Sequence, residues 1–282
     1  MDIKKYEVRD GKGFSLKEYS TFPTSQCTKK ERVQFLEDNR LEIQSLQSKL
    51  YAESKAGLLI IFQAMDGAGK DGAIKYVMSG VNPQGVRVHN FKVPSSTELA
   101  HDYLWRVQSC LPERGIIAIF NRSYYEDILV VKVHELYKNL NILDRCKDSN
   151  TITKRYGHIC NFEQYLYDNG IQLVKIFLNL SYEEQGKRFL RRLDRPDKNW
   201  KFSEGDIKER GYWNDYQVAY EKAIMATAAE NAPWYVVPAD NKPYARMIVS
   251  EIVKKSLLEL NPEYPRVSKE HAKRLKEYRD KI

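Results

Sequence analysis

Short, almost wholly apolar runs recur along the chain and alternate with longer segments that have helical periodicity. The runs occupy residues 58–62, 86–91, 115–120, 171–178 and 234–237. Runs of this kind are typical of strands buried on both faces of a parallel sheet. The helical segments cover residues 29–54, 96–110, 161–169, 181–193, 212–230 and 244–260. This alternation predicts an α/β fold, a doubly wound parallel sheet with helices on both faces.

The size and composition of the chain agree with a soluble α/β protein. The chain has 282 residues, of which 42% are hydrophobic and 30% are charged. No apolar run approaches the roughly 18 residues that a membrane helix needs, and the first residues lack the apolar core of a signal peptide. Four cysteines form no C-x-x-C pair, and five histidines form no H-x-x-x-H pair. We therefore expect reduced thiols, a cytoplasmic location, no membrane partner and no transition-metal site.

Changes in composition divide the chain into three regions. Residues 1–28 are expected to form an arm over the main domain. Residues 29–262 are expected to form that domain, with a charged lid inserted at about 186–211. Residues 263–282 form a basic tail, which we expect to be solvated or to contact another copy of the chain, with polyanion binding as the alternative.

A glycine-rich motif follows the first apolar run. Residues 62–72 read F-Q-A-M-D-G-A-G-K-D-G. A Walker A loop reads G-x-x-x-x-G-K-[ST], so Ala64 replaces its first glycine and Asp71 replaces its metal-binding hydroxyl. Gly67 and Gly69, with Ala68 between them, still allow the backbone to curl around phosphate oxygens.

Lys70 of this motif would reach the same phosphate oxygens from the start of a helix expected at about 69–78. The motif therefore predicts a phosphate loop that also includes Asp71. The alternative is an ordinary glycine-rich turn between a strand and a helix.

Asp66 lies inside this loop, where bound phosphates would repel its carboxylate unless a cation separated them. Its presence predicts Mg²⁺ between Asp66 and the phosphate oxygens, in place of the missing Ser or Thr. The alternative is that Asp66 caps the following helix, and both roles could coincide.

A second polar motif, N-R-S-Y-Y-E-D at residues 121–127, ends the apolar run 115–120. Asn121 stands where many phosphate-loop enzymes have a magnesium-binding aspartate. Arg122 could place its guanidinium on a phosphate, and Glu126 and Asp127 could supply the carboxylate that Asn121 lacks. The alternative is that these groups cap a helix that starts near Tyr125.

The segment 187–201 has the densest positive charge in the chain. It contains seven basic residues against Asp194 and Asp197. The basic residues are Lys187, Arg188, Arg191, Arg192, Arg195, Lys198 and Lys201. At helical spacing the four arginines fall on one side, and Phe189, Leu190 and Leu193 fall on the other. Such a row suits a linear polyanion such as polyphosphate, and a solvated basic face is the alternative.

Five motifs in sequence order resemble those of the type-2 polyphosphate kinase family. They are D-G-A-G-K-D-G (66–72), V-M-S-G-V-N-P-Q-G (77–85), F-K-V-P-S (91–95), H-D-Y-L-W-R (101–106) and F-N-R-S-Y-Y-E (120–126). The resemblance covers about residues 30–262. It implies a P-loop kinase-like core with a helical lid, Mg²⁺ as cofactor with Mn²⁺ as an alternative, and a homo-oligomer. It also implies reversible phosphoryl transfer between inorganic polyphosphate and adenine or guanine nucleotides.

The same resemblance assigns roles to individual positions. Asp66, Lys70 and Arg122 would lie at the reacting phosphates, and Lys92 and Arg106 would help to bind phosphate or nucleotide. For Arg106 an ion pair on a helix face is the alternative. The N-R-S-Y-Y-E motif resembles the branch that phosphorylates both nucleoside mono- and diphosphates, in which Glu126 adds a carboxylate at the metal.

The charge of the chain leaves two other functions open. The net charge of +8 favours a polyanionic partner without naming one. An ATP-dependent kinase acting on nucleotides or other small molecules would share the loop and the lid. A nucleic-acid-dependent ATPase would share the charge, but the sequence contains no recognisable nucleic-acid-binding module, so we expect no nucleic acid partner.

Overall fold

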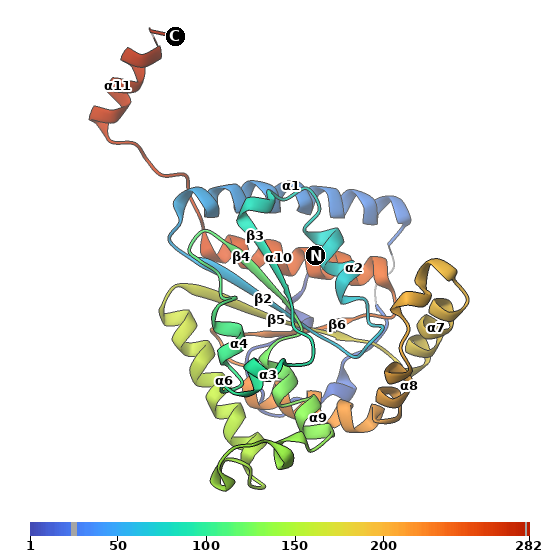
Figure 1. Cartoon of the computed structure of the whole chain (residues 1–282). Coiled ribbons are helices and arrows are strands. Elements are labelled where there is room, and N and C mark those ends of the chain that lie inside the picture. Colours follow the sequence, from blue (N-terminus) through green and yellow to red (C-terminus); the bar gives the residue numbers. More distant parts are fainter. Residues whose placement is uncertain (24–26, 280) are drawn as a thin grey trace.

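The computed structural model describes residues 1–23, 27–279 and 281–282, and its centre is a six-stranded sheet with the order β1-β6-β5-β2-β4-β3 (Figure 1). The strands are β1 (Glu7–Val8), β2 (Gly57–Gln63), β3 (Val86–Asn90), β4 (Ile117–Asn121), β5 (Ile171–Asn179) and β6 (Trp234–Pro238). β1 pairs with β6 antiparallel, and the other neighbours pair in parallel. The five strands expected from the apolar runs are confirmed, and β1 adds an edge strand from the N-terminal arm.

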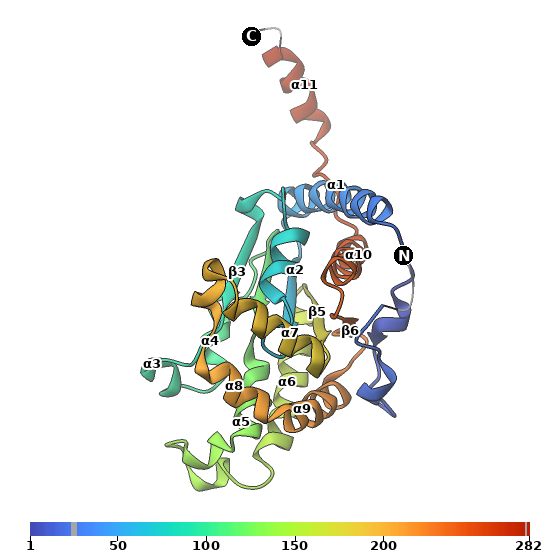
Figure 2. The ribbon, with the colours of Figure 1, turned by 90° about the vertical axis from the view of Figure 1, so that its right-hand side faces the viewer.

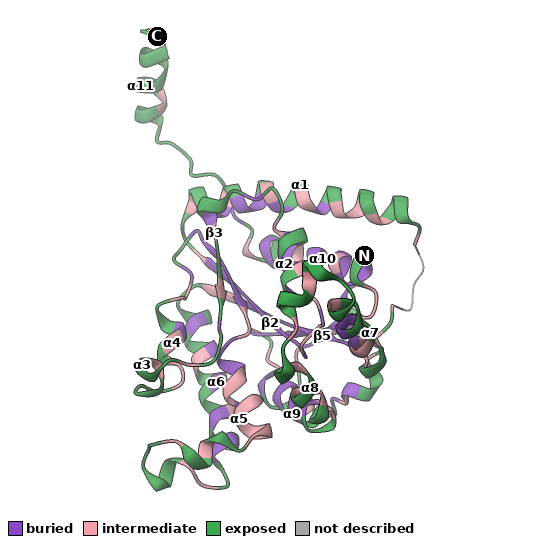
Figure 3. Ribbon diagram, turned by 45° about the vertical axis from the view of Figure 1, so that its right-hand side comes forward, coloured by how far each residue is buried: buried purple, intermediate pink, exposed green. Residues whose placement is uncertain are grey.

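Helices cover both faces of the sheet, as predicted (Figures 1 and 2). One face packs against α1 (Lys29–Glu53), α2 (Lys70–Val77) and α10 (Lys242–Leu260), and the other against α6 (Thr151–Asp168) and α9 (Trp213–Thr227). Successive side chains of β2 enter opposite layers: Ile60 joins the first and Ile61 the second. Because both layers exclude water from the sheet, the central strand β2 is buried throughout, and its neighbours β4 and β5 are mostly buried (Figure 3).

The structure contains further α-helices and several 3₁₀ helices. The α-helices are α3 (Ser96–Leu99), α4 (Trp105–Gln108), α5 (Val130–Val133), α7 (Tyr182–Leu193), α8 (Glu204–Gly211) and α11 (Lys269–Arg279). The 3₁₀ helices are η1 (Lys4–Tyr6), η2 (Leu16–Glu18), η3 (Pro83–Gly85), η4 (Tyr124–Asp127), η5 (Leu136–Asn139), η6 (Asp144–Cys146) and η7 (Pro196–Lys201). None of the helices in the described ranges is both long and apolar enough to cross a bilayer.

The prediction of one helix over residues 96–110 was wrong, because the chain forms two single turns there, α3 and α4. The carboxylate of Asp102 accepts a hydrogen bond from the backbone N–H of Leu104 at 2.9 Å. Aspartate favours such local turns over helix interiors because its side chain competes for backbone N–H groups. Hydrophobic periodicity carries no information about this competition.

The two ends of the chain differ in their contacts. Near the N-terminus, Tyr6, Val8 and Phe14 are buried in the two apolar layers. The C-terminal helix α11 extends away from the body (Figures 1 and 2). The proposed division into arm, domain and tail stays a prediction.

A buried polar network ties the second polar motif to the sheet. The ammonium of Lys175 on β5 lies 2.5 Å from a carboxylate oxygen of Glu163 on α6, and both side chains are buried. The other oxygen of Glu163 accepts hydrogen bonds from the hydroxyls of Tyr124 and Tyr125 at 2.9 and 2.8 Å. These tyrosines lie between Arg122 and Glu126 in the sequence, so the network positions the backbone that carries both side chains.

Replacing Lys175 with Met is expected to lower the free energy of unfolding by about 3–5 kcal/mol, because it leaves the Glu163 carboxylate buried without its cation. Urea unfolding measures this loss. Lys154→Met is the matched control: Lys154 pairs with Asp148 at the surface at 2.7 Å, and such pairs contribute about 1 kcal/mol or less. Equal, small losses for the two variants would contradict the role assigned to the buried network.

Candidate active site

The glycine-rich motif forms a loop between β2 and α2 at the carboxyl edge of the sheet. Gly67 and Gly69 have φ angles of 82° and 103°, in the left-handed region that glycine adopts without strain. Gly69 is the residue that caps α2, so the alternative role of Asp66 as the cap is wrong. No side chain in the described chain caps α2, and its first N–H groups are therefore available to an anion.

Lys70 begins α2, and its side chain turns inward. Its ammonium is buried and donates a hydrogen bond to the carbonyl oxygen of Ala64 at 3.0 Å. Burial lowers the pKa of Lys70, as does the positive charge of Arg122, while Asp66 and Glu126 act in the opposite direction. A lysine held in this way lies directly beneath the loop that would receive a phosphate.

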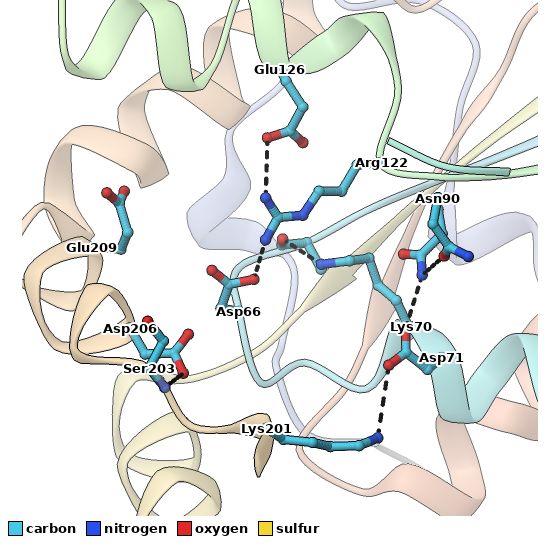
Figure 4. A network of polar contacts seen from close by, with 12 residues as sticks. Asp66, Lys70, Asp71, Asn90, Arg122, Glu126, Lys201, Ser203, Asp206 and Glu209 are labelled. Carbon is cyan, nitrogen blue, oxygen red and sulfur yellow. Dashed lines mark hydrogen bonds and ion pairs between the residues drawn. The ribbon is translucent and has the colours of Figure 1, made fainter. Parts of the chain in front are cut away.

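Arg122 lies between two carboxylates (Figure 4). One of its nitrogens is 2.5 Å from Asp66, and another is 3.8 Å from Glu126. Its backbone has a φ of 63°, which is uncommon for a residue other than glycine and typical of functional sites. Arg122 therefore has a fixed position beside the loop.

The two carboxylates differ in their electrostatic surroundings. Burial alone would raise the pKa of Asp66, but Lys70 and Arg122 outweigh it, and the net pKa is lowered. Burial raises the pKa of Glu126 despite Arg122 and Lys70. The surroundings thus favour the charged form of Asp66 more than that of Glu126, and Asp66 lines the cleft described below.

Two of the three residues that depart from the common phosphate-loop pattern, Asp71 and Asn121, contact each other. The side-chain amide of Asn121, at the end of β4, donates to the Asp71 carboxylate at 2.8 Å and to the Asn90 side chain at 2.7 Å. Lys201 lies 4.0 Å from Asp71 on the other side (Figure 4). Asp71 therefore contacts the end of β4 through Asn121, which also bonds Asn90 of β3. Through Lys201, Asp71 contacts the predicted lid at residues 186–211, which we call the lid segment.

A cleft of about 1180 Å³ brings together most of the predicted site residues. Those that line it are Asp66, Gly67, Ala68, Gly69, Lys70, Asp71, Lys92, Asn121, Arg122, Arg188, Arg191, Arg192, Arg195 and Lys198. Glu126 and Arg106 do not line this cleft. Glu126 lies beyond Arg122, and Arg106 lines a separate cavity of about 330 Å³.

Arg106 makes the ion pair that the sequence left as an alternative. Its guanidinium lies 3.1 Å from Glu98, and it donates to the carbonyl oxygen of Lys92 at 2.9 Å. It also lies over the ring of Phe91. Arg106 thus supports the segment that carries Lys92, and its predicted contact with phosphate or nucleotide stays a prediction.

The expected packing of α7, the helix that begins the basic segment, was wrong. Phe189 is buried, but Leu190 and Leu193 are 59% and 47% exposed, whereas Arg188 is only 3% exposed. The reason is that the guanidinium of Arg188 has backbone partners inside the protein, which periodicity alone does not reveal. Arg188 still borders the cleft, and its predicted contact with polyphosphate stays a prediction.

Gln185 and Arg188 on α7 bind three successive carbonyl groups of the phosphate loop. Gln185 donates to Asp66 O at 2.8 Å, and Arg188 donates to the carbonyl oxygens of Gly67 and Ala68 at 3.1 and 2.7 Å. Arg188 also reaches the carbonyl oxygen of Ala239 at 2.6 Å, beyond the end of β6. We call these contacts the loop brace. Since it engages the carbonyl groups, the brace holds the peptides of the loop in one orientation.

The other arginines of the basic segment 187–201 are paired with carboxylates. Arg191 lies 2.7 Å from Glu184, Arg192 lies 3.1 Å from Asp206, and Arg195 lies 2.9 Å from Asp197. Lys198 also lines the cleft. The predicted row of positive charge is therefore present in the cleft wall, and it is partly neutralised by its own neighbours.

Sequence reasoning missed several residues of the cleft. They are Lys75, Trp200, Lys201, Asp206, Lys242 and Arg246, of which Lys201 had been noted only as part of the basic segment. Lys242 and Arg246 follow the end of β6, on the edge where open α/β sheets bind their ligands, and that position could have indicated them. Asp206 of α8 lies near Asp66: burial raises its pKa, and the Asp66 charge adds to the effect. No local motif marked Asp206.

Comparisons with known proteins agree on one family. The family model described as Polyphosphate kinase 2 matches residues 26–265. The chain is 45% identical to an ADP-polyphosphate phosphotransferase of Rhodopseudomonas palustris over 282 residues, which cover 99% of this chain and 98% of that protein. It is 44% identical to an AMP/ADP-polyphosphate phosphotransferase of Meiothermus ruber over 265 residues, 93% of this chain and 96% of that protein.

A solved structure of polyphosphate kinase 2 from Arthrobacter aurescens is similar to this fold, with a TM-score of 0.85 and 39% identity. The match covers 93% of this chain and 91% of that one. The likeness therefore extends over nearly the whole of both chains.

The loop brace makes a testable distinction between two arginines on one helix. Arg188→Gln is expected to lower the free energy of unfolding by about 3 kcal/mol, because several buried carbonyl groups lose charge-assisted hydrogen bonds. Arg191→Gln, whose side chain is 56% exposed, is expected to change it by about 1 kcal/mol or less. Calorimetric melting of both variants measures the difference. Similar melting temperatures for the two variants would contradict the brace.

Proposed function

The chain belongs to the polyphosphate kinase 2 family and is a polyphosphate-dependent nucleotide phosphotransferase, and we propose that it phosphorylates both nucleoside mono- and diphosphates in a reversible, Mg²⁺-dependent reaction. One observation carries the proposal: Lys70 and the start of α2, which has no side-chain cap within the described residues, open into a cleft lined by cations from several elements. The related enzyme named for both AMP and ADP supports the two acceptors.

The donor binds in the basic cleft with its terminal phosphoryl group at the phosphate loop. The N–H groups of the loop and of the first turn of α2 surround the phosphoryl oxygens, and Lys70 and Arg122 neutralise their charge. The bond from the terminal phosphorus to the bridging oxygen of the polyphosphate breaks as a bond to an acceptor phosphate oxygen forms. Polyphosphate leaves one phosphate shorter, and positioning and charge neutralisation account for most of the acceleration.

The acceptor nucleotide enters from the opposite side of the segment 121–127. Arg122 of this segment lines the basic cleft, and Asp127 lines the smaller cavity of about 330 Å³. That cavity combines apolar side chains, such as Leu99 and Ile142, with cationic ones, such as Arg155. This mixture suits a nucleoside with its phosphate, since ligand pockets are mainly apolar with a few polar groups that fix orientation.

The site residues fit a magnesium ion that is completed by substrate phosphates. No group of three or more potential metal ligands gathers within the described residues, but Mg²⁺ in phosphoryl transferases commonly uses one or two carboxylates, with water and phosphate oxygens as further ligands. Asp66 lines the cleft and its surroundings favour its charged form, so it is the better placed ligand, and Glu126 is the second. When bound, the metal would neutralise charge on the transferred group.

The proposal includes three further properties: the bases of the acceptor nucleotides, the cellular location and the oligomeric state. Adenine and guanine nucleotides are the proposed acceptors, and a GDP-polyphosphate phosphotransferase of Pseudomonas aeruginosa is among the relatives. We also propose a cytoplasmic location and a homo-oligomer. The alternative of an ATP-dependent kinase differs in its donor, so the first experiment below separates the two.

Incubation with polyphosphate and Mg²⁺ but without ATP is expected to convert AMP to ADP and ADP to ATP, measured by chromatography of the nucleotides. Lys70→Ala should reduce the rate about 10²-fold or more, since it removes a charge at the transferred group. If nucleotides were phosphorylated only when ATP was supplied as donor, the proposal would fail.

Removal of divalent cations tests the metal separately. Treatment with EDTA is expected to abolish transfer, and added Mg²⁺ is expected to restore it, because the charge of the phosphates and Asp66 then lacks a counterion. Asp66→Asn should raise the Mg²⁺ concentration needed for half-maximal rate, while Asp215→Asn, a change on α9 outside the cleft, should not. Full activity in EDTA would refute the metal dependence.

A further inference from the structure

The first turns of α10 form a cleft wall that faces the lid segment. Lys242 and Arg246 lie one helical turn apart, so their side chains project from the same face, and both line the cleft. Lys242 reaches the phosphate loop: a Cβ added at Gly69 would lie 3.9 Å from its Cε and 3.7 Å from a nitrogen of Arg188. The Lys242 side chain therefore lies against the residue that caps α2.

Arg246 continues this wall along α2. Its guanidinium lies over the ring of Tyr76 at 3.6 Å, and a Cβ added at Gly72 would lie 3.5 Å from one of its nitrogens. Stacking on an aromatic face holds a guanidinium in place while its in-plane N–H groups stay available. Lys75 of α2 lines the same part of the cleft.

The cations of this wall differ in their partners from three arginines of the basic segment 187–201. Arg191, Arg192 and Arg195 each pair with a carboxylate. Over residues 1–23, 27–279 and 281–282, neither Lys242 nor Arg246 forms a hydrogen bond or an ion pair with one. The α10 wall is therefore the less neutralised side of the cleft.

The charges around Lys242 are mostly of its own sign. Partial withdrawal from solvent, followed by the charges of Arg188 and Arg191, lowers the pKa of Lys242 to about 8. Lys198 adds to this effect, while Glu184 opposes it and is itself bonded to Arg188 and Arg191. An anion that enters between these cations would relieve their repulsion.

We infer that Lys242 and Arg246 form the second wall of the polyphosphate channel, with Lys242 beside the reacting end of the donor and Arg246 one helical turn further along it. The inference rests on the proposed function and names residues and a direction for the donor chain. It follows that a short donor contacts Lys242 but not Arg246, whereas a long donor contacts both. Arg246 thus contributes to chain-length preference.

Steady-state kinetics with two donors, long-chain polyphosphate and tripolyphosphate, tests this arrangement. Lys242→Gln is expected to raise KM about tenfold for both donors, and Arg246→Gln is expected to raise it severalfold for the long donor only. The KM for the nucleotide and kcat should change less than twofold, and Lys242→Arg should restore most of the donor affinity. Lys30→Gln, which removes an equal charge from α1 outside the cleft, should behave like the unmodified chain.

The inference is overturned if both Gln variants keep the KM for polyphosphate within twofold of the original while Arg195→Gln raises it, because the lid would then hold the donor alone. Equilibrium binding of fluorescently labelled polyphosphate separates this failure from failure of the proposed function. If the unmodified protein transfers no phosphate from polyphosphate, the proposed function fails. Weaker binding to Lys242→Gln than to Lys30→Gln would still support the channel wall, and equal binding would refute it.

Discussion

The hydrogen bonds from α7 to the backbone of the phosphate loop are the constraint on which the rest of the site depends. A loop that presents N–H groups to an anion directs its carbonyl groups the other way, and those carbonyls need donors. Gln185 and Arg188 supply them, and Arg188 also reaches the connection between β6 and α10. One buried arginine therefore links the phosphate loop, the base of the lid segment and the wall that carries Lys242.

Carboxylates compensate the positive charge of the cleft unevenly. Asp66 and Glu126 flank Arg122, and carboxylates of the lid segment neutralise Arg192 and Arg195. A polyanion would have to compete with these internal partners on the lid side, but not at Lys242 and Arg246. In the proposed channel, such an arrangement would favour long chains of phosphate, since they would engage many weakly compensated cations at once.

Local features of the sequence predicted a large part of this structure. The strands and the glycine-rich loop were predicted from residues adjacent in the sequence. Apolar runs indicated the strands, and closely spaced glycines indicated the loop. The helix predicted over 96–110 was wrong because Asp102 forms a competing turn. Arg188 was assigned to the open row because periodicity places a residue on a face without specifying its partners, which come from residues about 50 and 120 positions away.

By itself the sequence determined the fold class and the family, because both rest on short motifs and on the period of apolar residues. Only the tertiary structure decided which cations are free to bind an anion. Arg188 supports the loop, and Arg191, Arg192 and Arg195 pair with carboxylates. Lys242 and Arg246 have no carboxylate partner among the described residues. The physical reason is that neutralisation depends on distances of a few ångströms between segments far apart in sequence, and those distances exist only in the folded chain.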